Sequence, residues 1–259
     1  MEQRLRKGEA RLTFEIILYL LNAIRRGRNV LGTITSVRTR RPFAALTFDD
    51  GPHPTYTPLL LDILDRHDAK ATFFLLGSRA TRYPRIVKNI AERGHTVANH
   101  SWDHPSLPHL STVNQLRQII DCQRALNPWG RKLFRPPYGH QGFWPRLYAA
   151  VLGYKVIAWS VHGRDWLNDD SIEIYGKLIS KVQAGSIVLL HDSLETVAHE
   201  NYLSRIPTLE AVDMLLDATK GKIHFVTVPE LLDTGRIVKE RWYKKGDVSW
   251  LNSLTKRDR

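Results

Sequence analysis

Short apolar segments alternate with longer amphipathic segments along most of this 259-residue chain. The apolar segments resemble buried strands, and the amphipathic ones repeat their apolar residues at helical spacing. Strands that alternate with helices form a parallel sheet, and the chain length favours its closure into a barrel of roughly seven or eight strands. We predict strands at 43–50, 69–77, 132–139, 154–161 and 186–193, two more beginning at 95 and 223, and helices at 57–68, 83–94, 111–127, 143–153, 170–185 and 206–221.

The formal net charge is +12, and the basic excess lies mainly at the two ends of the chain. We therefore expect a basic N-terminal extension (1–41), a globular domain (42–235) and a basic C-terminal tail (236–259). Such a charge favours anionic partners, namely membrane lipid, acidic glycans or nucleic acid, or it serves solubility alone. Nucleic-acid binding is disfavoured because no basic stripe with stacking aromatics and no recognisable binding module is present.

An apolar run, Phe14 to Ile24, lies between basic residues in the N-terminal extension. It is shorter than the ~20 apolar residues that span a bilayer. Glu15 and Asn22 interrupt it and no small-residue cleavage site follows, so a signal peptide is a poor interpretation. We expect a helix that packs on the domain or on a second subunit, with peripheral contact to an anionic membrane as the alternative.

The location of the protein is inferred from two weak observations, the absent cleavage site and the single cysteine, Cys122. One cysteine permits no internal disulfide and gives no sign of an oxidising compartment. We expect a cytoplasmic protein that can rest on the inner membrane face. An uncleaved signal anchor that places the domain outside is the competing interpretation.

Polar residues gather where the predicted strands end. In parallel α/β folds the carboxyl ends of the strands meet at one edge, where active groups collect. Five strand ends that carry chemistry are hard to explain by stability alone. These ends hold Asp49 with Asp50, His100 with His104, Arg135 with Tyr138, Asp165 with Trp166, and His191 with Asp192.

The fragment HSWDH places two histidines, His100 and His104, four residues apart. We expect this spacing to put both imidazoles on one side of a helical turn, where they can converge on one metal ion. Two histidines alone are a weak signal. With a carboxylate from the DD pair they would form a His-His-Asp set that leaves coordination positions open for water and substrate.

Five motifs, in order and at similar spacing, resemble the polysaccharide deacetylases with a NodB homology domain, carbohydrate esterase family 4. They are TFDDGP, HSWDH, RPPYG, RDW and LLH, and the resemblance covers about residues 42–232. Each motif is modest by itself, but five in order are very specific. The resemblance implies a distorted (β/α) barrel of seven or eight parallel strands and metal-dependent removal of N-acetyl or O-acetyl groups from sugars.

The resemblance assigns different roles to the adjacent aspartates. It implies that Asp50, His100 and His104 bind one divalent metal ion, with zinc as the default and cobalt, nickel or manganese as alternatives. It implies that Asp49 is the general base, and that Arg135 holds this carboxylate ionised and oriented. Without a cation, two neighbouring carboxylates would repel each other and raise one pKa.

The same resemblance implies that His191 is the general acid, oriented by Asp165. It also implies that the Tyr138 backbone N–H stabilises the oxyanion, and that Trp166 and Leu189 line the pocket for the acetyl methyl group. Taken singly, Trp166 and Leu189 are more simply explained as core residues. One departure is His162, which stands where the family often has the first aspartate of its fourth motif.

The predicted function is therefore hydrolysis of an N-acetyl group, or alternatively an O-acetyl group, on a poly- or oligosaccharide or glycan precursor. The runner-up is a metal-dependent C–N hydrolase of the same barrel that acts on a non-sugar amide. An inert glycan-binding relative ranks lower, because it predicts the loss of a ligand, base or acid, and none is lost. The expected partner is an N-acetylated glycan. The sequence leaves open which glycan it is and what the oligomeric state is.

Overall fold

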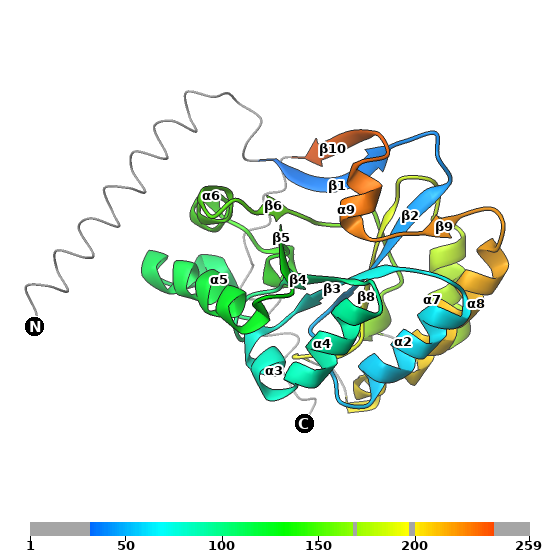
Figure 1. Cartoon of the computed structure of the whole chain (residues 1–259), viewed down its shortest axis with the longest axis horizontal. Coiled ribbons are helices and arrows are strands. Elements are labelled where there is room, and N and C mark those ends of the chain that lie inside the picture. The colour runs from blue at the N-terminus through cyan, green and yellow to red at the C-terminus, as the bar shows by residue number, and fades with distance from the viewer. Residues whose placement is uncertain (1–31, 168–169, 197–199, 241–259) are drawn as a thin grey trace, which may run out of the picture.

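The computed structural model describes residues 32–167, 170–196 and 200–240 (Figure 1). The predicted N-terminal helix, and the C-terminal tail beyond residue 240, lie outside this described part. Within it, the six predicted helices and all seven predicted strand regions are present, but several are shorter than predicted: the helix expected to reach 185 ends at Ile179, and the strand expected at 154–161 is only Lys155–Val156.

The centre of the fold is a curled parallel sheet in the order β6-β5-β4-β3-β2-β8-β7, with β9 beside the start of β2. Every pairing in this sheet is parallel, which confirms the predicted distorted (β/α) barrel. The strands are β2 (Phe43–Asp49), β3 (Ala71–Leu75), β4 (Thr96–Asn99), β5 (Gly130–Phe134), β6 (Lys155–Val156), β7 (Val161–His162), β8 (Ile187–His191) and β9 (His224–Phe225).

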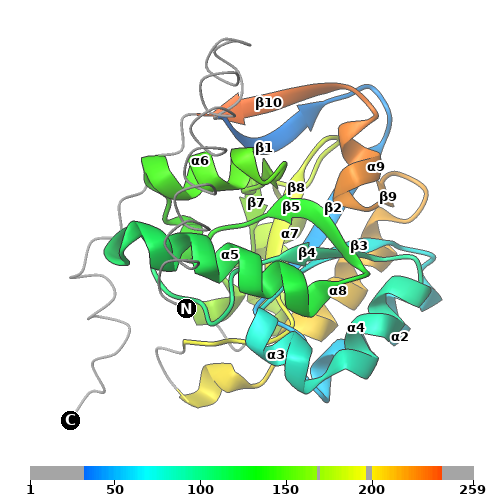
Figure 2. The same ribbon diagram turned by 60° about the vertical axis from the view of Figure 1, so that its left-hand side comes forward.

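Helices surround the outer face of the sheet, as the two ribbon views show (Figures 1 and 2). The sequence explains individual helix starts: Ser111 caps one helix through Asn114 N–H, and Asp170 caps another through Ile172 and Glu173 N–H. The helices are α2 (Tyr56–Arg66), α3 (Gly77–Arg82), α4 (Pro84–Glu92), α5 (Thr112–Leu126), α6 (Phe143–Val151), α7 (Ser171–Ile179), α8 (Ile206–Thr219) and α9 (Val228–Leu232).

Strand β2 shows how the core positions the site. Successive side chains of a strand point to opposite faces of the sheet. Leu46 and Phe48 point outward into the main core beneath the helices, where Phe48 stacks on Phe73 at 5.3 Å. Thr47 and Asp49 therefore point to the inner face, and Asp49 reaches the carboxyl edge of the sheet.

A two-stranded antiparallel ribbon, β1 (Thr33–Arg38) with β10 (Arg236–Glu240), lies across one side of the barrel. Isolated bridges tie β1 to the sheet: Ile34 pairs with Ile157, just after the edge strand β6, and Ser36 pairs with Ser186, just before β8. The ordered fold extends on both sides of the range 42–235 that was expected for the globular domain.

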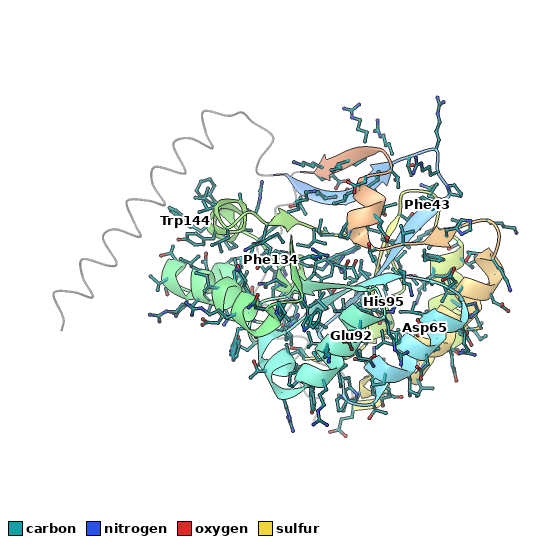
Figure 3. The ribbon with its side chains drawn as sticks, in the orientation of Figure 1. Phe43, Asp65, Glu92, His95, Phe134 and Trp144 are labelled. Atoms are coloured by element: carbon teal, nitrogen blue, oxygen red, sulfur yellow. The ribbon has the colours of Figure 1, made fainter. Side chains whose placement is uncertain are left out.

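Side chains fill the space between the strands and the helices (Figure 3). Phe134 at the end of β5 is buried, whereas Trp144 on α6 is 46% exposed at the outer side of that helix. Among the described residues, no helix combines the length and apolar character needed to cross a membrane.

Candidate active site

The turn after β2 separates the two adjacent aspartates. Asp49 ends the strand in extended conformation, and Asp50 follows with a left-handed backbone, φ 69°. Their carboxylates therefore point to different partners, although both are buried. Gly51 comes next because a Cβ at this position would collide with the carboxylate of Asp192.

Asp49 is paired with Arg135, which follows β5. Arg135 Nη1 donates to Asp49 Oδ1 at 2.6 Å and to Thr47 Oγ1 at 2.8 Å. The guanidinium is fully buried, and Nη2 also donates to the Ala158 carbonyl oxygen at 3.0 Å. Phe74 packs against its face at 4.1 Å. Burial lowers the pKa of Arg135, and the neighbouring Asp49 carboxylate opposes that shift.

The two histidines of the HSWDH fragment lie in the loop after β4, so the predicted helical turn is wrong. Ser101 and His104 have left-handed backbones, φ 74° and φ 62°, and these bend the chain back on itself. The bend brings the imidazole rings of His100 and His104 to 5.0 Å between centroids. The rings converge through loop geometry and not through helical periodicity.

Asp50, His100 and His104 form a buried cluster whose ligand atoms all lie within 4.8 Å of one another. Asp50 Oδ1 is 3.3 Å from His100 Nε2 and 3.1 Å from His104 Nε2. The Arg135 carbonyl oxygen accepts from His100 Nδ1 at 2.7 Å, which leaves Nε2 as the ring nitrogen that faces the carboxylate. Asp50 Oδ2 accepts from Glu195 N–H at 3.0 Å.

The protonation states fit a cation at this cluster. Burial raises the pKa of Asp50, but His104 and His100 outweigh it and hold that pKa well below its usual range. Burial lowers the pKa of His104 to about 3. The cluster therefore combines the Asp50 carboxylate with a His104 imidazole whose neutral form is favoured, and Asp50 Oδ1 is a buried oxygen with no hydrogen-bond donor in the described residues. A divalent metal ion would satisfy these converging lone pairs.

Asp165 and His191 form a second buried pair. Asp165 begins the short helix η3 (Asp165–Leu167), and its Oδ1 accepts from His191 Nδ1 at 3.0 Å. Its Oδ2 accepts from the His191 backbone N–H at 2.8 Å. Burial disfavours the imidazolium, but Asp165 dominates with help from Asp50 and Asp49 and raises the pKa of His191 to about 9. His191 is therefore mainly protonated at neutral pH.

The other predicted site residues, Trp166, Tyr138 and Leu189, differ in how closely they contact the site. Trp166 packs its ring edge-on against His191 at 5.5 Å, and Tyr138 packs against His104 at 4.4 Å. Tyr138 has a left-handed backbone, φ 56°, and its hydroxyl lies 3.0 Å from Thr196 Oγ1. Leu189 is buried on β8 two residues before His191, on the same face of the strand.

Two strand-end residues differ from the rest of the site. His162 ends β7, with its ring centroid 5.4 Å from that of Trp166, which in turn contacts His191. Asp192 turns away from the metal-ligand cluster and accepts from Thr57 Oγ1. Burial raises the pKa of Asp192 to about 7.

Sequence reasoning missed two groups at the start of α8 that contact Asp165. Arg205, immediately before that helix, donates from Nη1 to the Asp165 carbonyl oxygen at 3.0 Å, and Thr208 Oγ1 lies 3.4 Å from Asp165 Oδ2. Their local sequence carries no motif. The only available signal was an arginine beside an apolar helix, which is common on protein surfaces.

The fold and the site together define a class of protein: a distorted (β/α) barrel with a candidate metal site beside a buried Asp–Arg pair and a buried Asp–His pair. The polysaccharide deacetylase family model matches residues 36–157. A peptidoglycan-N-acetylglucosamine deacetylase of Bacillus cereus is 37% identical over 193 residues, which cover 73% of this chain and 87% of that protein. The chain therefore belongs to the polysaccharide deacetylase family, carbohydrate esterase family 4.

Other similar proteins show the range of the family. The chain is 36% identical over 207 residues to the peptidoglycan-N-acetylglucosamine deacetylase PgdA of Listeria monocytogenes; the match covers 78% of this chain but only 41% of that protein's length. A chitooligosaccharide deacetylase of Sinorhizobium fredii is 34% identical, with 73% of this chain and 90% of that protein covered.

Two solved structures extend the comparison. The Bc1960 peptidoglycan N-acetylglucosamine deacetylase superposes with a TM-score of 0.71 at 33% identity, covering 78% of this chain and 93% of that chain. The pseudoenzyme BA3943 of Bacillus anthracis superposes with a TM-score of 0.68 at 27% identity, covering 80% and 71%. The shared fold therefore includes both enzymes and an inactive relative.

Proposed function

We propose that this protein is a metal-dependent deacetylase that hydrolyses N-acetyl groups on a glycan. The observation that carries the proposal is the Asp50–His100–His104 cluster. Beside it lie one group that can accept a proton and one that can donate a proton. Asp49 lies on β2 in register with His191 on β8, so a base held by Arg135 and an imidazolium held by Asp165 stand on neighbouring strands. Hydrolysis of an amide needs such a pair.

Asp50, His100 and His104 would hold the divalent ion, for which zinc is our first choice because one carboxylate and two imidazoles suit it. When bound, such an ion polarises the acetyl carbonyl and lowers the pKa of water. Arg135 keeps Asp49 ionised, so this carboxylate can accept the proton of the attacking water molecule. The Tyr138 backbone N–H is the proposed donor to the oxyanion that develops on the carbonyl oxygen.

His191 completes the reaction as the proposed acid. Its Nδ1 is engaged by Asp165, which leaves Nε2 as the nitrogen that can donate a proton to the amide nitrogen as the C–N bond breaks. The amine leaves, and acetate is the second product. Trp166 and Leu189 are proposed to border the acetyl methyl group, with Trp166 supported by its contact with His191.

The proposed substrate is a glycan that contains N-acetylglucosamine. This choice rests on the names of the relatives, which include deacetylases of peptidoglycan and of chitooligosaccharides. An O-acetyl sugar is a weaker candidate, and a non-sugar amide weaker still. The pseudoenzyme relative makes an inert glycan-binding protein a real alternative. Evidence against it is the presence of three candidate metal ligands, of the Asp49–Arg135 pair and of the Asp165–His191 pair.

Acetate release tests the proposal directly. Purified full-length protein would be incubated with N-acetylated chitooligosaccharides, peptidoglycan fragments, an O-acetylated xylan and a simple aryl acetamide, each with added zinc, cobalt, nickel, manganese or a chelator. We expect metal-dependent acetate release from at least one N-acetylated glycan. Release only from the aryl amide would support the non-sugar alternative. Glycan binding without release under any metal would overturn the enzymatic proposal.

A matched variant tests the metal ligands in the same assay. His104→Ala should lose most bound metal, measured by elemental analysis, and nearly all acetate release. His109→Ala is the control, because His109 lies in the following short helix η1 (Leu107–His109) and is not among the cluster ligands. Full metal occupancy in His104→Ala would refute the ligand assignment.

A further inference from the structure

Arg205 is one of the two largest side chains that are fully buried among the described residues; the other is Arg135 of the site. It lies at the N-terminus of α8, and Asp165 of η3 contacts it on one side and His191 on the other. Burying a guanidinium is costly unless its charge is compensated. The groups that contact Arg205 therefore indicate the role of its positive charge.

The contacts of Arg205 centre on Asp165. Nη1 donates to the Asp165 carbonyl oxygen at 3.0 Å and lies 3.7 Å from Asp165 Oδ2. Nη2 donates to the Tyr202 carbonyl oxygen. The Thr208 hydroxyl donates to the same Oδ2 at 3.4 Å. Asp165 is thus held from one side by His191 and from the other by α8.

We propose that Arg205 is a positioning residue for the acid of the reaction: its permanent positive charge compensates and orients the buried Asp165 carboxylate while His191 changes protonation state. The inference rests on the proposed function, in which His191 donates a proton. The family resemblance assigns no role to Arg205, and the sequence around this residue contains no recognisable motif.

The charge balance explains why such a residue is needed. Before proton transfer, the carboxylate of Asp165 is balanced by the imidazolium of His191. When Nε2 gives its proton to the leaving nitrogen, His191 becomes neutral and Asp165 would remain as a fully buried anion. A buried uncompensated carboxylate is strongly disfavoured and would pull the proton back. Arg205 at 3.7 Å compensates it in both states.

Other charged groups lie near His191, Asp165 and Arg205, and a test must leave these groups unchanged. Asp49 and Asp50 face His191 from β2, and Asp50, Asp192 and Tyr56 lie near Arg205. None of them is altered by a substitution at position 205. A difference between variants at this position therefore reports the charge of residue 205.

Two neutral variants and one charged variant separate a positioning role from a purely structural one. Arg205→Met keeps an aliphatic stem and removes the charge. Arg205→Gln is also neutral but retains an N–H donor for the Asp165 carbonyl oxygen, and it serves if the Met variant does not fold. Arg205→Lys keeps the charge and loses the planar fork. Arg93→Met is the control, since it removes an arginine paired with Asp62 and Asp65 on the outer helices.

The readout is the titration of His191, followed by NMR on full-length protein with isotope-labelled histidine, zinc-loaded and zinc-free. A spectrum of His191→Gln assigns the signal. Removing the nearby Arg205 cation makes it harder for the Asp165–His191 pair to lose its proton. Arg205→Met and Arg205→Gln should therefore raise the apparent pKa of His191 by about one unit or more. Arg205→Lys and Arg93→Met should leave it within a few tenths of a unit. The alkaline limb of kcat should move in the same direction, with kcat at least 10-fold lower in the neutral variants and KM little changed.

Two results would overturn the inference. One is an unchanged His191 titration in both neutral variants; the other is an equal shift in Arg205→Lys. Loss of thermal stability without a change in titration would assign Arg205 a structural role. Because the titration needs no turnover, it remains informative if the chain releases no acetate from any glycan, a result that would count against the proposed function instead.

Discussion

At the scale of single residues, the two aspartates of TFDDGP show how neighbours in sequence acquire different contacts. The left-handed backbone of Asp50 turns its side chain toward His100 and His104, while Asp49 continues the strand and meets Arg135. Asparagine tolerates the left-handed region well, so replacing either carboxylate by its amide changes charge with little backbone strain. The pair is therefore well suited to a comparison of variants.

Asp49→Asn should keep bound metal and lose turnover by about 100-fold or more, because the amide cannot accept the proton. Asp50→Asn should lose both metal and turnover. Metal content by elemental analysis and acetate release are the two measurements. Asp103→Asn is the control, since Asp103 lies between the two histidines in sequence but bonds to Gln118 on the surface. Equal metal content in the two site variants would contradict the division of labour.

At the scale of elements, β2, β4, β5 and β8 bring candidate site residues to the carboxyl edge of the sheet, while other elements hold the opposite end of the barrel. Helix α9 is one of these other elements. It begins with a capping box, in which Thr227 Oγ1 accepts from Glu230 N–H while the Glu230 carboxylate accepts from Thr227 N–H. Strand β9, just before it, pairs with Phe43 and Ala44 at the start of β2, so this helix lies at the end of the barrel opposite the site.

Thr227→Ala should therefore lower the free energy of unfolding by about 1 kcal/mol, a typical value for the loss of an N-cap. The activity measured at a temperature well below the transition should be unchanged. Thr227→Ser keeps the accepting oxygen and should recover most of the stability. Chemical denaturation of the three proteins checks the values, and a large loss of activity in the Ala variant would show that α9 supports the site.

At the scale of the whole molecule, the distribution of charge separates the ends of the chain from its body. Residues 1–31 hold seven Lys and Arg against three Asp and Glu, and residues 241–259 hold six against two. These ends thus carry +8 of the net +12. They adjoin the same end of the β1–β10 ribbon, where Thr33 pairs with Glu240. We propose that the combined charge gives a peripheral, salt-sensitive contact with anionic lipid.

Full-length protein should sediment with vesicles that contain phosphatidylglycerol and not with neutral vesicles, and high salt should release it. Changing Arg25, Arg26 and Arg28 together to Gln should weaken partitioning by roughly 100-fold, from about 1 kcal/mol for each basic residue near the surface. The control changes three exposed basic residues of α3 and α4 to Gln, with the same loss of charge: Arg82, Arg85 and Lys88. Equal loss in both triple variants would show that net charge alone governs the contact.

The sequence by itself determined the architecture and most of the site. Alternating periodicity is a local property, so strands, helices and their order could be predicted from neighbouring residues. Parallel strands then bring their carboxyl ends to one edge, which explains why Asp49, Asp50, Arg135, Asp165 and His191 could be expected together. The family resemblance added the division of roles, which spacing alone left open.

Tertiary structure decided what depends on contacts between distant segments. His100 and His104 converge through left-handed loop residues and not through a helical turn, because hydrogen bonds to Arg135 and Ser101 hold the loop. The β1–β10 ribbon pairs strands from the two ends of the chain, and neither has a strong pattern of its own. Arg205 looks like any arginine beside a helix, and only the folded barrel buries it against Asp165. In each case the deciding energy comes from burial and pairing with a remote partner, which no local window of sequence contains.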